Sequence, residues 1–268
     1  MSISREILNL IESIGELSNR SKRIYNKLIK TIREYSYTDA VDYIEDIVQD
    51  RKLRFLLSLG FGGDLATLFL SSRKVYLPVR SLVPTQNEID LSSSLAWSIN
   101  GKKSVDYLFK DKVTVIAPIV TFKNTFVIDG HHRWSQAYCT NPEVKVLCIN
   151  FSGDLSPISM LKAVQATIGS NTGRIPKSHV RGLSIYDASE SQIINYISNN
   201  MTNSSSISIS KHIGANSRDE VIKYLANNCL ELKANNPPIT DAPDRDLMPQ
   251  TSKDPDSLED LSRGVTRV

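Results

Sequence analysis

Cysteine is scarce in this sequence, and its three cysteines form neither a CxxC pair nor a cluster. An odd number of well-separated cysteines argues against a disulfide framework and favours a reducing compartment. HExxH and GxxxxGKS/T motifs are also absent, which argues against zincin and P-loop chemistry. We therefore expect a protein of the cytoplasm.

Long hydrophobic runs and a strong charge of one sign are missing as well. The most apolar stretch, residues 55–70, is shorter than the ~20 residues that span a bilayer and contains Asp64 and three glycines. We interpret it as a buried helix-turn-helix and expect no membrane partner. The N-terminus lacks the basic start and apolar run of a signal peptide. A formal net charge of +3 and a pI of about 8.6 are only mildly basic and identify no partner.

Composition and apolar periodicity divide the chain into a helical N-terminal region, an α/β core, a helical extension and an acidic tail. In order, these regions are residues 1–72, 73–152, 153–232 and 233–268. The first and third regions have apolar residues three and four apart, which predicts amphipathic helices. Helices of the extension are expected at 155–170, 187–200 and 217–232. The tail is rich in Asn, Pro, Asp and Ser and is predicted to be flexible.

The N-terminal region carries a concentration of positive charge on its second predicted helix. The basic residues there are Arg20, Lys22, Arg23, Lys27, Lys30 and Arg33. They could contact nucleic-acid phosphates, although the solvated face of an amphipathic helix explains them without a partner and is the interpretation we favour. Thr38 or Asp39 is expected to cap the third helix.

The core region predicts one sheet with a helix inserted between its strands. Residues 74–90 predict a strand and a proline-marked loop, and residues 113–130 predict two strands joined by the polar turn Lys123–Asn124. A helix beginning near His131 precedes a further strand at 144–151. A strand, a helix and a strand within ~30 residues are typical of α/β architecture. The predicted fold class is therefore α/β (α+β), with a mixed sheet and flanking helices.

The stretch "FVIDGHHRW" carries the candidate binding site. Asp129 is expected at the N-cap of the helix, where its carboxylate accepts backbone N–H groups. Gly130 removes a side chain from the bend, so that a phosphate can approach the helix N-terminus and its positive dipole end. His131, His132 and Arg133 add donors in the same turn.

The same helix is expected to have an apolar face. Trp134, Ala137 and Tyr138 lie three and four residues apart and should pack against the sheet. Adjacent histidines on a helix point about 100° apart, so His131 and His132 are poorly placed to hold one metal ion. We expect no metal ligands in this motif.

The motif "VIDGHHRWSQA", together with the upstream "VRSLVPTQNEID", resembles the ParB/sulfiredoxin superfamily. In that superfamily a Pro-x-Gln-type loop and a Gly-x-x-Arg helix start bracket a nucleotide. The matching positions here are Pro84, Thr85, Gln86, Glu88, Gly130, His132, Arg133 and Ala137. The resemblance covers roughly residues 74–151 and implies a ParB/sulfiredoxin-like nucleotide-binding core at 73–152.

Differences between the branches of the superfamily indicate which branch this chain resembles most. The catalytic cysteine of sulfiredoxins is replaced here by His131, and the Gly-Glu-Arg-Arg of partition ParB proteins is not kept. The motif Asp-Gly-His-His-Arg is most similar to the ParB-like branch that includes free-serine kinases and phage and mobile-element proteins. That resemblance implies Glu88 as a general base and His132 as a second catalytic residue.

The resemblance also implies the ligand and the residues that hold it. The ligand would be ATP, ADP or CTP with Mg²⁺. Its phosphates would contact Thr85, Gln86, Asp129, Gly130, His131, His132 and Arg133. Two motifs about 45 residues apart form one site only if the fold brings them together, so Gln86 or Glu88 should lie across a cleft from His132 and Arg133.

Three hypotheses remain open on the sequence. The chain is a nucleotide-dependent phosphotransferase or NTPase of phage or mobile-element type, with the phosphates at the helix start. Alternatively, it is a ParB-like DNA-binding protein or nuclease that uses the nucleotide as a switch. As a third option, it is a catalytically inactive component of a virion or of another oligomeric assembly. The expected location is the bacterial host cytoplasm, or the virion under the third hypothesis.

Overall fold

The computed structural model describes most of the chain, which forms two compact units. The described residues are 19, 23–24, 26–51, 54, 70–100, 102–115, 118–174 and 182–248. One unit draws on the described parts of 1–71, 153–177 and 247–268, and the other on those of 72–152 and 178–246. The predicted helix-turn-helix at 55–70 lies outside the described residues except for its last residue, as do Arg20 and Lys22.

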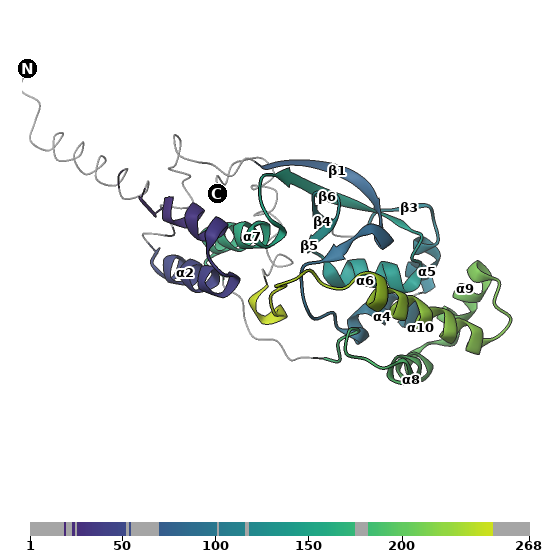
Figure 1. The fold of residues 1–268 in the computed structure, drawn as a ribbon. Coiled ribbons are helices and arrows are strands. Elements are labelled where there is room, and N and C mark those ends of the chain that lie inside the picture. The colour runs from purple at the N-terminus through teal and green to yellow at the C-terminus, as the bar shows by residue number, and fades with distance from the viewer. Residues whose placement is uncertain are drawn as a thin grey trace, which may run out of the picture. The chain divides into compact units, whose positions relative to one another are not determined.

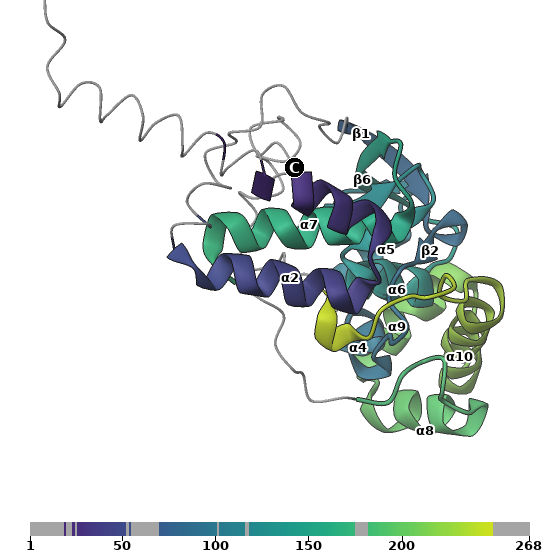
Figure 2. The same ribbon diagram turned by 60° about the vertical axis from the view of Figure 1, so that its left-hand side comes forward.

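The first unit is built on a pair of helices, α2 (Tyr37–Gln49) and α7 (Pro157–Thr172). Figures 1 and 2 show the two helices side by side. A Cβ placed on Gly169 would lie 2.9 Å from Cγ1 of Val48, so glycine allows the close approach of the helices. The predicted extension 153–232 is therefore shared, because α7 belongs to this unit and the helices after residue 178 belong to the other.

The cap of α2 differs from the expected one. Ser36 is the N-cap, and its Oγ accepts a hydrogen bond from the backbone N–H of Asp39 at 3.1 Å. The prediction of Thr38 or Asp39 was wrong because the helix begins earlier, at the buried Tyr37. Asp39 instead places an acidic side chain in the first turn, where it interacts favourably with the helix dipole.

The second unit contains a mixed sheet, as the sequence predicted, and six strands form it within the described residues. The strands are β1 (Leu70–Pro78), β2 (Val83–Pro84), β3 (Lys112–Val113), β4 (Ile119–Phe122), β5 (Phe126–Asp129) and β6 (Lys145–Gly153). Their order is β1-β6-β4-β5-β2, and β3 also pairs with β6. β2 runs parallel to β5, and both β3 and β4 run parallel to β6, whereas β4 and β5 are antiparallel.

The hairpin between β4 and β5 turns where the sequence predicted. Lys123 and Asn124 both have positive φ, 53° and 58°. Two successive left-handed residues are typical of a type I′ turn, whose twist matches that of the paired strands. The turn is fastened to β6, because Asn124 donates its backbone N–H to Oδ1 of Asn150 at 2.7 Å.

The helices of the second unit are α4 (Leu91–Asn100), α5 (Lys102–Leu108), α6 (His131–Thr140), α8 (Glu190–Asn200), α9 (Asn203–Ile213) and α10 (Arg218–Asn235). Of these, α6 packs directly on the sheet, and the other helices pack on α6 or on one another (Figure 1). Short 3-10 helices lie at η1 (Val79–Ser81) and η2 (Arg245–Leu247). The sequence predicted α6, α8 and α10 but not α4, α5 or α9. No helix within the described ranges has the length and apolar character needed to span a membrane.

Helix α6 packs through its predicted apolar face. Trp134, Ala137 and Tyr138 are at most 1% exposed, which confirms the expected packing. The indole Nε1 of Trp134 donates to the carbonyl of Val79 at 2.9 Å. Trp134 and Tyr138 meet edge to face with ring centroids 6.1 Å apart, a favourable aromatic geometry.

The first part of the predicted tail lies against the core. Helix α10 continues to Asn235, and the buried side chain of Asn236 donates to the carbonyls of Arg80 and Leu82 at 2.9 and 2.8 Å. Farther along, the backbone N–H of Ile239 donates to the carbonyl of Pro84 at 3.2 Å. Residues 236–239 therefore extend the core instead of leaving it.

Candidate functional site

The two predicted motifs meet because their strands are parallel neighbours. β2 and β5 pair with Val83 opposite Phe126 and Pro84 opposite Val127. Parallel strands end at the same edge of a sheet, so the segment beginning at Thr85 leaves the sheet beside the start of α6. This register explains how motifs about 45 residues apart reach one place.

A direct hydrogen bond joins the motifs at that edge. The backbone N–H of Thr85 donates to Nε2 of His131 at 3.2 Å, and the Thr85 hydroxyl donates to the carbonyl of Val127 at 2.5 Å. Thr85 and His131 are 0% and 5% exposed. The contact is therefore a buried link between the proline-marked loop and the helix start.

The link requires a neutral imidazole. Burial is the main cause that lowers the pKa of His131 from 6.5 to about 3, together with the charges of His132 and Arg133 and against a backbone hydrogen bond with Val127 that raises it. Nε2 accepts from Thr85, so the ring proton is assigned to Nδ1. His131 thus positions the loop, and its Nε2 is an acceptor instead of the phosphate donor that the sequence suggested.

The start of α6 differs from the prediction at its cap. The N-cap is Gly130, with a left-handed φ of 86°, and no side chain caps the helix. The expected Asp129 cap was wrong because Asp129 ends β5 and lies one residue before the capping position. The capping position itself is therefore taken by a residue without a side chain.

Asp129 instead holds Arg133, one helical turn later. Its Oδ2 lies 2.8 Å from Nη2 of Arg133, which also donates to the carbonyl of Pro118 at 3.3 Å. The two side chains are 18% and 22% exposed, and Nε of Arg133 is buried without a hydrogen-bond partner among the described residues. The predicted phosphate donor is thus already held in a defined orientation by an ion pair.

Gly130 also makes room for that guanidinium. A Cβ at residue 130 would lie 2.8 Å from Nη2 and 3.0 Å from Nε of Arg133. Glycine therefore meets two requirements at this position, the left-handed backbone and the close approach of Arg133.

The remaining residues of the first motif lie on the loop after β2. Gln86 is buried, and its Nε2 donates to the carbonyl of Glu88, whose own side chain is half-buried. Beyond them, Asp90 caps α4, since its Oδ1 accepts from the Ser92 hydroxyl and the Ser93 backbone N–H at 2.7 Å each.

Asp90 is a functional candidate that the sequence analysis missed. Burial opposes its ionisation, but hydrogen bonds from Ser93 and Ser92 and the charge of His132 outweigh that effect and lower its pKa. The effect of His132 shows that the second motif also reaches this part of the loop. In the sequence Asp90 stands directly before Leu91 and a run of three serines. An Asp just before the first apolar residue of a helix is a helix-start pattern that could have identified it.

A buried seam of hydroxyl groups fixes α6 against α4. Ser94 meets Ser135, and Ser98 meets Thr140, each pair at 2.7 Å between hydroxyl oxygens. All four residues are fully buried. Hydroxyl pairs of this kind leave little freedom for the two helices to slide, which fixes the start of α6 relative to the loop.

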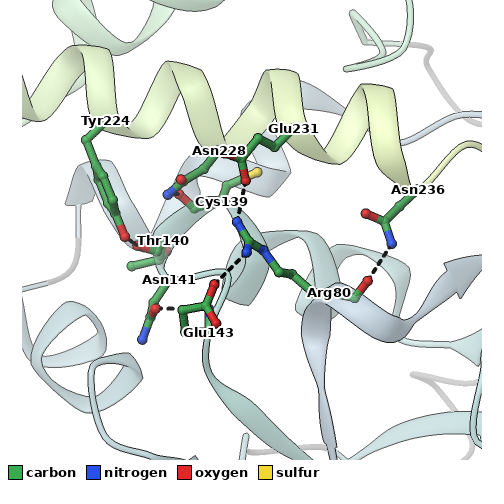
Figure 3. Close-up of polar contacts among 9 residues, drawn as sticks. All are labelled: Arg80, Cys139, Thr140, Asn141, Glu143, Tyr224, Asn228, Glu231 and Asn236. Carbon is green, nitrogen blue, oxygen red and sulfur yellow. Dashed lines mark hydrogen bonds and ion pairs between the residues drawn. The ribbon is translucent and has the colours of Figure 1, made fainter.

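The C-terminal end of α6 is fixed by α10, as Figure 3 shows. Tyr224 and Asn228 donate to the carbonyls of Thr140 and Cys139 at 3.2 and 3.0 Å, which satisfies acceptors that a helix end leaves unpaired. Arg80 joins the same region by binding two carboxylates. Its partners are Glu143 at 2.8 Å and Glu231 at 2.6 Å.

Comparisons of the chain with protein-family models, with curated proteins and with solved structures find no match. Within the described ranges, no three His, Cys, Asp or Glu side chains gather as ligands for a metal ion. The function is therefore inferred from the chemistry of the residues around Thr85 and His131.

Proposed function

We propose that the chain binds a nucleoside di- or triphosphate at the start of α6 and acts as a nucleotide-dependent phosphotransferase or NTPase. The buried hydrogen bond between Thr85 and His131 is the observation that carries this proposal, because it joins the two motifs expected to bracket a nucleotide. ATP, ADP or CTP, with Mg²⁺, is the ligand that the ParB/sulfiredoxin resemblance suggests.

The start of α6 has the chemistry for a phosphate. Its helix has ten residues, its N-cap is a glycine without a side-chain cap, and the helix dipole is positive at this end. Peptide N–H groups that no side chain caps can donate to phosphate oxygens. The missing Cβ of Gly130 lets the Arg133 guanidinium lie close to the backbone of this turn.

Arg133 supplies the fixed positive charge. A guanidinium keeps its charge at every working pH and can contact two phosphate oxygens at once. Its pairing with Asp129 orients it in advance, so an incoming phosphate shares the guanidinium with Asp129 or displaces it. Glu88 is proposed as the base that orients the acceptor, and His132 as the second catalytic residue.

A second candidate function is favoured by one surface of the second unit. Tyr76 and Tyr107 are 39% and 36% exposed, and Lys112 and Lys110 lie over their rings at 5.8 and 5.0 Å from the centroids. Exposed aromatic rings among lysines can stack on bases while the lysines contact phosphates. This surface supports the alternative of a DNA-binding protein or nuclease that uses the nucleotide as a switch.

The resemblance to the ParB/sulfiredoxin superfamily also suggests the origin and the cellular location of the protein. A phage or mobile-element protein in the cytoplasm of a bacterial host is the proposal, and an inactive virion or oligomer component is the third alternative. Enzyme, switch and structural component differ in one observable respect, which is the fate of the bound nucleotide.

Calorimetric titration with ATP, ADP and CTP, in chelator and then in Mg²⁺, tests the binding step. Arg133→Ala should weaken binding by about 2–4 kcal/mol, and Arg133→Lys should restore only part of it because the planar fork is lost. Lys145→Ala, which removes an exposed cation paired with Asp111, is the matched control. Equal affinity of the Arg133→Ala variant and the unaltered protein would refute the proposed site.

Release of inorganic phosphate, with and without DNA, then separates the hypotheses. Turnover that Glu88→Gln abolishes supports the enzyme. Binding without turnover, with a response to DNA, supports the switch. A protein that binds none of the three nucleotides leaves the structural component as the best description.

A further inference from the structure

A pocket of about 490 Å³ lies in the second unit between the start of α4 and one face of α8. Its polar lining includes Asp90, Ser92, Gln192, Asn195, Tyr196 and Asn199. None of the residues proposed to bind the nucleotide lines it. Its volume is within the range of small-molecule sites in proteins.

Asp90 gives the pocket a negative charge. Its Oδ1 is occupied by Ser92 and Ser93, whereas no residue of the described ranges donates a hydrogen bond to its Oδ2. The backbone of Gly182 lies close to this oxygen, since a Cβ at residue 182 would be 1.9 Å from Oδ2. Any larger residue at that position would disturb the carboxylate, so glycine preserves the shape of the pocket around it.

The opposite wall is neutral and polar. Gln192, Asn195, Tyr196 and Asn199 are spaced three and four residues apart, so they share one face of α8. Carboxamides both donate and accept hydrogen bonds, as a phenol does. Such a wall fits a ligand with hydroxyl or amide groups.

The charge of the lining determines what the pocket can accept. Among the described residues, those that line the pocket include one carboxylate and no Lys, Arg or His. A phosphate or carboxylate would therefore meet a like charge with no compensating cation among these residues, whereas an ammonium group would pair with Oδ2 of Asp90. A cation at one end of the ligand and hydroxyl groups along its length match the two walls.

We infer that this pocket binds a small hydroxylated molecule with a primary ammonium group, held by Asp90 at one end and by the carboxamides of α8 along its length. The described residues that line the pocket differ from those proposed to bind the nucleotide, and the pocket selects a ligand of the opposite charge.

Glucosamine and N-acetylglucosamine are a matched pair of probes, because acetylation removes the ammonium charge and keeps the hydroxyl groups. Each is titrated at millimolar concentrations, at mildly acidic pH, into the full-length ¹⁵N-labelled protein. Glucosamine should shift the amide resonances of residues 90–93 and 192–200 in a saturable manner. N-acetylglucosamine should bind at least roughly tenfold more weakly.

Asp90→Asn is the decisive variant, because asparagine caps a helix about as well as aspartate and only the charge is lost. It should reduce the affinity for glucosamine roughly tenfold without lowering the melting temperature. Asp111→Asn, which removes an exposed carboxylate outside the pocket, should bind as the unaltered protein does.

A second variant tests the opposite wall. Asn195→Ala removes an exposed carboxamide and should weaken binding several-fold with no loss of stability. The inference is overturned if glucosamine causes no saturable shifts, if both sugars bind equally, or if Asp90→Asn binds as tightly as the unaltered protein. Shifts that map away from both walls would overturn it as well.

Discussion

Arg133 lies directly over Gly130, with Nη2 2.8 Å from the place where a Cβ of residue 130 would be, and is held there by Asp129. One glycine thus determines both the backbone at the start of α6 and the position of the guanidinium. Gly214, at the end of α9, has a similar φ of 71°, but no atom of the described residues lies within 4 Å of its missing Cβ. Gly130 precedes a helix and Gly214 follows one, but the two share a left-handed backbone and differ in what surrounds the missing Cβ, which makes them a useful pair for mutation.

Gly130→Ala should therefore destabilise the protein more than Gly214→Ala. Both substitutions force alanine into a left-handed backbone at a cost of about 1–2 kcal/mol, and only the first also displaces Arg133. Urea unfolding of both variants measures the difference, and nucleotide titration should show weakened binding for Gly130→Ala alone. Equal destabilisation with unchanged nucleotide affinity would contradict the role given to Gly130.

Stability should fall on acidification through the buried histidine. The folded-state pKa of His131 is about 3, below the usual 6.5, so the unfolded chain binds more protons between these values. Stability linked to His131 is therefore complete above pH 6.5 and decreases as the pH falls towards 3, by up to about 1.4 kcal/mol per pH unit.

His131→Gln is the control for that slope, since its Oε1 can accept from the N–H of Thr85 without titrating. The measurement is the free energy of unfolding by urea from neutral to mildly acid pH, for both proteins. The difference between the two curves should contain the histidine contribution, because the carboxylates are common to both. Parallel curves would show that His131 is not buried and neutral.

Asn236 should fasten the segment after α10 to the core. Asn236→Ala leaves the carbonyls of Arg80 and Leu82 without this partner and should cost about 1–3 kcal/mol. Asn235→Ala, at the exposed neighbouring position, should be nearly neutral. Thermal unfolding compares the two, and similar melting temperatures would mean that the segment is not held by this side chain.

The indole of Trp134 should contribute through both its volume and its N–H. Trp134→Ala should cost about 3–5 kcal/mol, because the ring is fully buried. Trp134→Phe should cost less, about 1–3 kcal/mol, mainly for the hydrogen bond to Val79 that it loses. Denaturant unfolding gives both values, and a neutral Trp134→Ala would contradict the packing of α6.

Local features of the fold were predictable because neighbouring residues decide them. The turn Lys123–Asn124 is marked by an asparagine between two apolar runs, and α6 by a glycine followed by apolar residues at helical spacing. Such patterns predicted the hairpin, the start of α6, its apolar face and the strand at 144–151, which the structure has at Lys145–Gly153.

Helices whose sequences carry a conflicting pattern were not predictable. The run "SISIS" of α9 alternates in the manner of a strand, yet Ile209 is fully buried and Ile207 is 58% exposed on the same helix. The serines of α4 weaken its apolar pattern, and Ser94 and Ser98 are buried only because hydroxyl partners on α6 receive them. Tertiary packing outweighed local propensity in both helices.

The sequence by itself determined the hairpin turn, the glycine at the start of α6 and the burial of Trp134, since each depends on residues within one or two turns of chain. Only the tertiary structure decided that Thr85 meets His131, that Arg133 is held by Asp129 above Gly130, and that Asn236 reaches Arg80 and Leu82. The first and last of these contacts join residues far apart in the chain, and the second depends on where β5 ends. Strand register and helix packing bring such groups together, and neither is written in any short stretch of sequence.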